Sequence, residues 1–230
     1  MYASVRNKIS RFSLIGYDDD YYFDSCEYRV RCVIDGDYIR KTILKKIDVR
    51  SYQKIQKHDF PLCVTTFPEI QSADYIQISF LKINGTQRNL QHDIRTETGN
   101  SSTPLLAKSG YFKQAKHTYV RSLSLSPDKP TIIEIEYTTV VPKNDTVYIC
   151  RVSSPCRKFN FHFYLDGNNK SKHRINLSAF GFIDDGSSTP NHHDDTPSVS
   201  ITLDDWIFPR DGVTVTIMEK TIVPALQIPQ

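Results

Sequence analysis

Hydrophobic and polar residues alternate with a period of two along much of the chain. In residues 21–34, Val30 and Cys32 fall on one face, whereas Arg29 and Arg31 fall on the other. Successive side chains of a β-strand point to opposite faces, so this alternation predicts a strand that is buried on one side. Similar patterns predict strands over residues 75–81, 117–125, 131–141, 158–165, 172–183, 198–203 and 212–218.

The inward faces of these strands predict the hydrophobic core. Its expected members are Tyr28, Val30, Cys32, Ile78, Phe80, Ile133, Ile135, Phe159, Phe161 and Phe163.

Residues 38–58 are compatible with two structures. Ile39, Ile43 and Ile47 recur every four residues, and the stretch contains no Gly or Pro, as in an amphipathic helix. The preceding strand and the Asp35-Gly36 turn signal instead favour a hairpin, whose second strand would carry the intervening lysines on a wet surface. The hairpin is the preferred interpretation.

Closely spaced strands with turns between them are typical of an all-β fold. The expected class is mainly β: an antiparallel sandwich or barrel of eight to ten strands, with room for one short helix. Residues 96–104 and 184–197 are polar, contain Gly and Pro, and are expected to be surface loops. Residues 1–230 are taken as a single unit. The break in the pattern at residues 126–130 also allows two packed β-subdomains.

Composition supports this fold class and limits the partners. The 230 residues include 13 Tyr and 12 Phe, which suit a half-buried pleated surface, and the net charge is only +3. That charge gives no strong signal for nucleic-acid binding. No apolar run is long enough to span a bilayer. Five cysteines, an odd number, favour a reduced, cytoplasmic protein. Four Asn-x-Ser/Thr sequons keep a secreted protein, or a domain trimmed from a membrane protein, open as alternatives.

Cysteine spacing argues against a structural zinc site. Cys26 and Cys32 share one expected strand, and Cys150 and Cys156 have the same spacing. Six residues of strand span roughly 20 Å at about 3.3 Å per residue, whereas ligands of one zinc ion lie within a few ångströms of each other. Buried, unreactive thiols are the expected state, and no metal or other cofactor is predicted.

The chain also lacks familiar catalytic and phosphate-binding motifs. It contains no G-x-S-x-G, Walker A or G-x-G-x-x-G run. His192 and His193 stand beside two aspartates, which are suitable ligand and acid–base types, but they lie in a polar loop without a third ligand at a recognisable spacing. No catalytic residue is therefore assigned, although an enzyme with an unrecognised site stays open.

The segment around the single tryptophan is the candidate recognition site, with the alternative that Trp206 plugs the end of the sandwich and residues 209–212 merely turn the chain. Trp206 follows two aspartates and precedes Arg210 in a turn-forming sequence. Tryptophan and arginine often anchor interfaces, and loops at the end of a β-scaffold gather binding residues. The expected ligand-binding residues are Trp206, Arg210, His192 and His193. The expected function is a non-enzymatic module that binds or senses a small ligand or a protein partner. The alternatives are a jelly-roll-type structural subunit and a hydrolase with an unrecognised site.

Overall fold

The computed structural model describes residues 20–66, 76–100, 113–167, 170–181, 191–193, 197–209 and 211–220. The strands in chain order are β1 (Tyr21–Asp35), β2 (Tyr38–Ser51), β3 (Ile55–Thr66), β4 (Ile76–Ile83), β5 (Thr86–Gln87), β6 (Ile94–Asn100), β7 (Lys113–Leu125), β8 (Thr131–Pro142), β9 (Val147–Arg151), β10 (Phe159–Asp166), β11 (His173–Phe180), β12 (Asn191–His193), β13 (Ser198–Leu203) and β14 (Gly212–Glu219). A four-residue helix, α2 (Leu90–Asp93), and a short 3-10 turn (Lys170–Lys172) complete the described elements.

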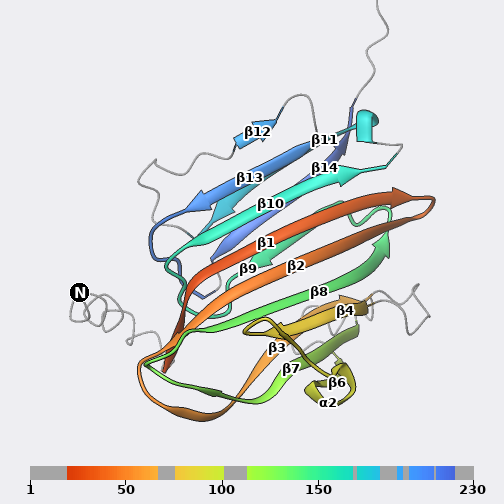
Figure 1. Ribbon diagram of the computed structural model, residues 1–230. Coiled ribbons are helices and arrows are strands. Elements are labelled where there is room, and N and C mark those ends of the chain that lie inside the picture. The colour runs from red at the N-terminus through yellow and green to blue at the C-terminus, as the bar shows by residue number, and fades with distance from the viewer. Residues whose placement is uncertain are drawn as a thin grey trace, which may run out of the picture.

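Three sheets build the fold, and they confirm the predicted mainly-β class. The largest has the strand order β12-β13-β10-β1-β2-β8-β4-β5, and two smaller sheets have the orders β11-β14-β9 and β3-β7-β6. All the strand pairs are antiparallel except β1 with β10. In Figure 1, β11, β14 and β9 lie behind the upper strands of the large sheet, whereas β3, β6 and β7 lie at its lower end. The described strands exceed the expected eight to ten. β5 and β12 are too short to show a pattern, and β3, β6 and β9 were not predicted as separate strands.

The hairpin interpretation is confirmed for residues 38–51, which form β2, whereas residues 55–58 begin β3 in a different sheet. β1 and β2 pair in register around the turn at Gly36, whose φ of +57° is a left-handed conformation that glycine tolerates. The expectation that the lysines of β2 face water is wrong. Lys41 and Lys45 occupy the same buried face as Ile39, Ile43 and Ile47.

Both lysines are held inside by aromatic and acidic neighbours. Lys41 Nζ lies 3.4 Å from Asp145 Oδ2 and 5.6 Å from the centre of the Tyr148 ring. Lys45 Nζ lies 5.2 Å from the centre of the Tyr28 ring. Cation–π contacts and an ion pair offset part of the cost of taking an ammonium group out of water. A polar layer therefore crosses an otherwise apolar core.

Most of the expected core residues are buried. Phe159, Phe161 and Phe163 project from β10 between the layers and are at most 1% exposed. Buried and half-buried residues alternate along β10, as the alternation of hydrophobic and polar residues in the sequence predicted. The eight-stranded sheet is thus anchored on a row of phenylalanines.

The expectation that Ile78 and Phe80 belong to the fully buried core is wrong. The register between β4 and β8 shifts between these two residues, so the alternation changes face. Leu81 and Ile83 are buried instead. Phe80 is only partly buried, and Lys82 Nζ lies 4.8 Å from the centre of its ring.

The two expected loops contain strand residues. Residues 96–100 belong to β6 and pair with β7, and residues 191–193 form β12 at the edge of the large sheet. Much of both loops lies outside the described residues. Residues 126–130 form the turn between β7 and β8, closed by an isolated bridge between Ser126 and Lys129. Here the chain passes from a small sheet to the large one, while the proposal of two subdomains stays a prediction.

Candidate functional site

Trp206 lies in a row of three aromatic rings at one end of the large sheet. The centre of its ring is 5.4 Å from that of Tyr22, which in turn is 5.2 Å from that of Tyr52. The two ring pairs are tilted by 55° and 30°. Trp206 and Tyr22 are half-buried and Tyr52 is 37% exposed. We call these three residues the aromatic end.

The row joins segments that are far apart in the sequence. Tyr22 is near the start of β1 and pairs with Arg50 on β2, so it shares the outer face of the sheet with Tyr52 two residues further on. The Tyr52 N–H donates to the carbonyl oxygen of Asp20 at 2.9 Å, which extends the β1–β2 pairing by one step. Two tyrosines are thereby held by the main hairpin of the fold.

Trp206 is held from the other side by its neighbours in sequence. Ile207 is 3% exposed, and its N–H and carbonyl group exchange two 2.9 Å hydrogen bonds with Cys156. The Trp206 N–H donates to Oδ1 of Asp205 at 2.7 Å. It is therefore Ile207 that fills the end of the core, and the indole packs against Tyr22 at the surface.

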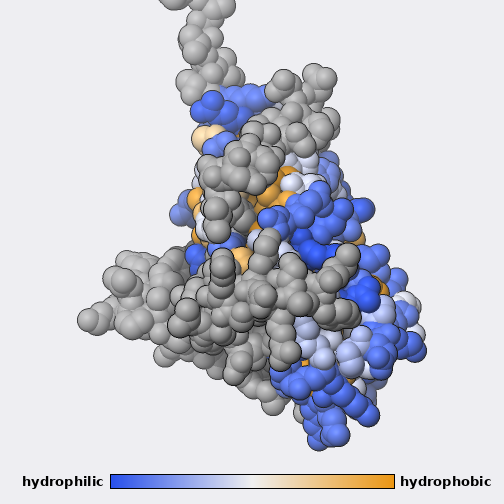
Figure 2. Space-filling view, turned by 90° about the vertical axis from the view of Figure 1, so that its left-hand side faces the viewer, coloured by the Kyte–Doolittle hydropathy of each residue, from blue (hydrophilic) through white to orange (hydrophobic). Residues whose placement is uncertain are grey.

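Charged residues surround the aromatic end. Arg157 pairs with Asp24 at 2.8 Å, Lys158 with Asp204 at 3.1 Å, and Arg50 with Asp48 at 3.0 Å. Asp20, Asp204 and Asp205 belong to the exposed residues. In Figure 2, which turns this side of the molecule toward the viewer, described residues are mostly hydrophilic and a small hydrophobic area shows between them.

Burial changes the acidity of two groups nearby. It raises the pKa of the Tyr52 phenol well above its usual value, and the neighbouring Tyr22 raises it further. Burial also raises the pKa of Asp211, although the Phe208 N–H donates to that carboxylate at 3.0 Å and opposes the change. Both shifts favour the protonated form of the group.

The other predicted ligand-binding residues are not all described. Arg210 lies outside the described residues. His192 and His193 pair with Val199 and Ser198, at the start of β13, whereas Trp206 follows the end of β13. Their backbone therefore lies toward the opposite end of that strand. Their part in a site with Trp206 stays a prediction.

The expected ligand-binding residues include neither Tyr22 nor Tyr52, although Tyr22 stands in an aromatic run directly after acidic residues. Both follow the period-two alternation on the polar face, where an aromatic residue is out of place beside Asp20 and Arg50. That mismatch was the available signal.

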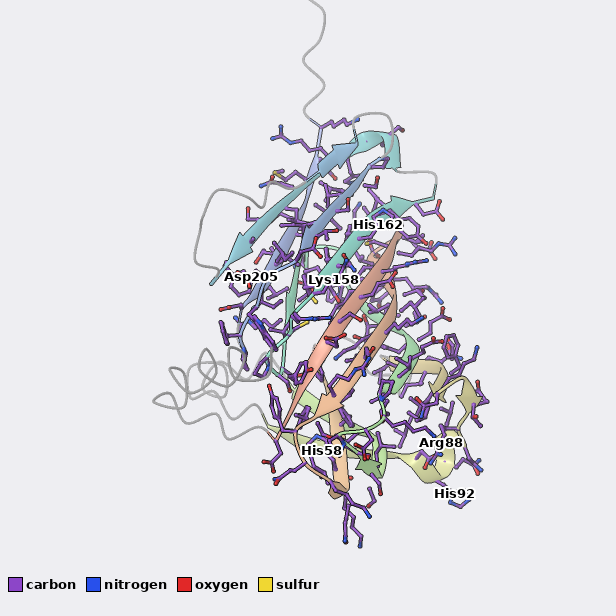
Figure 3. The ribbon with its side chains drawn as sticks, turned by 60° about the vertical axis from the view of Figure 1, so that its left-hand side comes forward. His58, Arg88, His92, Lys158, His162 and Asp205 are labelled. Atoms are coloured by element: carbon purple, nitrogen blue, oxygen red, sulfur yellow. The ribbon has the colours of Figure 1, made fainter. Side chains whose placement is uncertain are left out.

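Other titratable groups are dispersed. Figure 3 shows His58, His92 and His162 well apart, on β3, α2 and β10. His58 packs between the rings of Tyr21 and Phe60, with ring centres at 4.4 and 4.7 Å, and burial lowers its pKa. Its Nε2 is buried without a hydrogen-bond partner.

The cysteines that the structure describes in full are buried free thiols, as expected: Cys26, Cys32, Cys150 and Cys156. Burial raises the pKa of Cys26 to about 11 and that of Cys32 to about 12, and it raises the pKa of the other two as well. The thiolate is the reactive form, so these thiols are weak nucleophiles at neutral pH.

Two kinds of feature are absent from the described residues. No three or more His, Cys, Asp or Glu side chains gather there as a metal-binding group. No described helix is long and apolar enough to cross a bilayer.

Comparisons with known proteins give no family. No family model matches the chain, and no curated protein matches it. Among solved structures, a putative protease from Parabacteroides distasonis is 10% identical with a TM-score of 0.49, and an M1 zinc metallopeptidase from Deinococcus radiodurans is 9% identical with a TM-score of 0.38. Leukotriene A4 hydrolase from Saccharomyces cerevisiae is 8% identical with a TM-score of 0.43.

These alignments cover 86% of this chain in each case, but only 40%, 43% and 29% of the respective other chains. The chain thus spans less than half the length of each of these proteins. At such identities and scores the similarity assigns no activity.

Proposed function

We propose that this chain is a non-enzymatic recognition module that binds a protein partner over the aromatic end. The observation that carries the proposal is the contact of Tyr52, Tyr22 and Trp206, three partly exposed rings from three distant segments. Tyrosine and tryptophan carry much of the binding energy at protein interfaces, and they cost little side-chain entropy when they are held in place.

The scaffold beneath the rings supports this role. Tyr22 and Tyr52 are fixed by the β1–β2 pairing, and Trp206 is fixed by the two hydrogen bonds of Ile207 to Cys156. A surface that is ordered before binding avoids part of the entropic cost of association. The surrounding ion pairs supply a polar rim of the kind found around interface anchors.

The alternatives from the sequence predict other behaviour. A jelly-roll-type structural subunit would assemble with copies of itself, which size-exclusion chromatography coupled to light scattering measures. A hydrolase would need a reactive group. The buried thiols and dispersed histidines of the described residues do not support that assignment as strongly as the aromatic end supports binding.

The test uses the only tryptophan as its reporter. Linear peptides are selected from a random display library against the wild-type protein, and their binding is followed by Trp206 emission and by its protection from iodide. Binding over the aromatic end should protect the indole, and Tyr52→Ala should weaken binding about tenfold or more, the cost typical of an interface anchor.

Tyr38→Ala is the matched control. Tyr38 is 47% exposed and lies at the other end of the same hairpin, so its loss should leave peptide affinity unchanged. Selected peptides that bind Tyr52→Ala as tightly as the wild type, or that leave the indole accessible to iodide, would overturn the proposal.

A further inference from the structure

On the basis of the proposed function, we infer that the partner segment is positively charged and places an arginine guanidinium against the aromatic end. Three features of the described residues lead to this inference: the excess of carboxylates around the rings, the pairing of the local cations, and the chemistry of the rings themselves.

Among the described residues, carboxylates outnumber cations around the three rings. Asp20, Asp24, Asp204 and Asp205 lie within two residues of a ring in sequence, and Asp48 pairs with Arg50. The described basic residues are Arg50, Lys54, Arg157 and Lys158. This excess is local, because the whole chain carries a net charge of +3. A cationic partner would therefore be attracted to this end of the molecule in particular.

Three of these four cations already have partners. Arg50, Arg157 and Lys158 each form an ion pair with an aspartate at 3.1 Å or less. An anionic ligand would have to compete with those carboxylates for the same donors. A cationic ligand instead meets exposed carboxylates, among them Asp20 beside Tyr52 and Asp204, whose side chain is 68% exposed.

The ion pair at Asp204 can be exchanged at little cost. Lys158 is itself 49% exposed, and a pair between two such groups contributes little to stability. A guanidinium offers two parallel N–H donors to one carboxylate, which an ammonium group does not. Arginine from a partner can thus replace Lys158 at Asp204 while Lys158 turns to solvent.

The rings favour the same ligand. A tyrosine phenol is protonated at neutral pH, so Tyr52 presents a neutral ring with a negative face. Guanidinium groups stack on such faces, and arginine makes this contact more often than lysine. Tyr52 is 37% exposed, so part of this residue is accessible to a planar group of a partner.

The experiment compares capped peptides of equal length that repeat Gly-Arg, Gly-Lys, Gly-Glu or Gly-Ser, with Trp206 emission as the readout. The Gly-Arg peptide should bind most tightly, the Gly-Lys peptide several-fold more weakly, and the other two least. Asp20→Asn and Asp204→Asn together should weaken Gly-Arg binding about tenfold, as expected for the loss of two charge-assisted contacts. Asp37→Asn, at the opposite end of the hairpin, should not change it.

The outcomes separate the two proposals. If the Gly-Glu or Gly-Ser peptide binds at least as tightly as Gly-Arg, and Tyr52→Ala abolishes that binding, the charge inference is overturned while the recognition function stands. If Gly-Arg binding is unchanged in the double aspartate variant, the inference is overturned too. If library-selected peptides also bind Tyr52→Ala as tightly as the wild type, both the charge inference and the proposed function are overturned.

Discussion

The two ends of the β1–β2 hairpin each expose a tyrosine, yet they are built differently. At the turn, Tyr38 follows Gly36 and Asp37 in sequence. Its ring packs on no other aromatic ring among the described residues. At the open end, Tyr52 is less exposed and packs on Tyr22, which packs on Trp206. Both ends therefore expose a tyrosine, whereas among the described residues it is at the open end that rings from distant segments meet.

The ends are also stabilised by different means. Beneath the turn end, Lys41 is buried and paired with Asp145, and the Lys143 N–H donates to the carbonyl oxygen of Asp37 at 2.8 Å. The aromatic end is held by ring packing and by the buried Ile207. One end therefore depends on a charge inside the core, and the other on apolar and aromatic contacts. The following predictions test that contrast.

The largest effect is expected from the core that supports both ends. Phe161 is 1% exposed, and its ring lies parallel to that of Phe159 with centres 6.3 Å apart. Phe161→Ala should lower the free energy of unfolding by about 3 to 5 kcal/mol, through lost burial and the cavity left behind. Urea denaturation followed by circular dichroism measures it. A loss below about 0.5 kcal/mol, the range of ordinary surface substitutions, would mean that β10 faces the other way.

Breaking the buried ion pair should be the next largest effect. Asp145→Ala leaves the Lys41 ammonium buried without its carboxylate and should cost about 2 to 3 kcal/mol, less than for a fully buried pair because Asp145 is partly exposed. Lys41→Met is the matched variant. It removes the charge but keeps the stem, so unfolding free energy should change by less than about 1 kcal/mol. Equal losses in both variants would contradict this account of the turn end.

Removing the indole should have a smaller effect on folding. Trp206 is half-buried, so Trp206→Ala should cost about 1 to 2 kcal/mol, in proportion to the apolar area it covers. Tyr38→Ala should cost less than about 0.5 kcal/mol, as for an exposed residue. Thermal denaturation of the two variants side by side measures the difference. A Trp206→Ala loss as large as that of Phe161→Ala would make the indole a core residue and remove the basis of the recognition surface.

Acid should weaken the contact between Tyr21 on β1 and His58 on β3. His58 packs on Tyr21, the neighbour of Tyr22, and burial lowers its pKa below the ordinary value of 6.5. The folded state therefore favours neutral His58. The corresponding stability is fully present above pH 6.5 and is lost as the pH falls below 6.5 and through the lowered pKa.

The matched variant for this effect is His58→Phe, which keeps the ring packing and does not titrate. Denaturation midpoints of wild type and variant should converge at neutral pH and separate as the pH falls, with the wild type the less stable. Parallel pH profiles would show that another group accounts for the acid sensitivity.

The sequence determined the identity of most strands. Alternation over residues 21–34, 131–141 and 158–165 predicts β1, β8 and β10 to within a residue or two. This works because a strand with one buried face has hydrophobic and polar residues at alternate positions. The Asp35-Gly36 turn favours a hairpin over a helix for residues 38–51. It too is a local feature of the sequence.

Tertiary structure alone determined the faces of β4, the burial of Lys41 and the contacts of the aromatic end. The bulge after Ile78 exchanges the faces of β4, and only the register with β8 reveals it. The burial of Lys41 depends on Asp145 and Tyr148, about a hundred residues further along the chain. The same holds for the aromatic end. Trp206 was recognisable as a lone indole. Tyr22 meets it, and Tyr52 meets Tyr22, only because β1 pairs with β2 on one side and with β10 on the other, with β13 next. Local periodicity fixes a strand and its faces, whereas contacts between distant segments follow from the order in which strands assemble, which the pattern of any single strand does not contain.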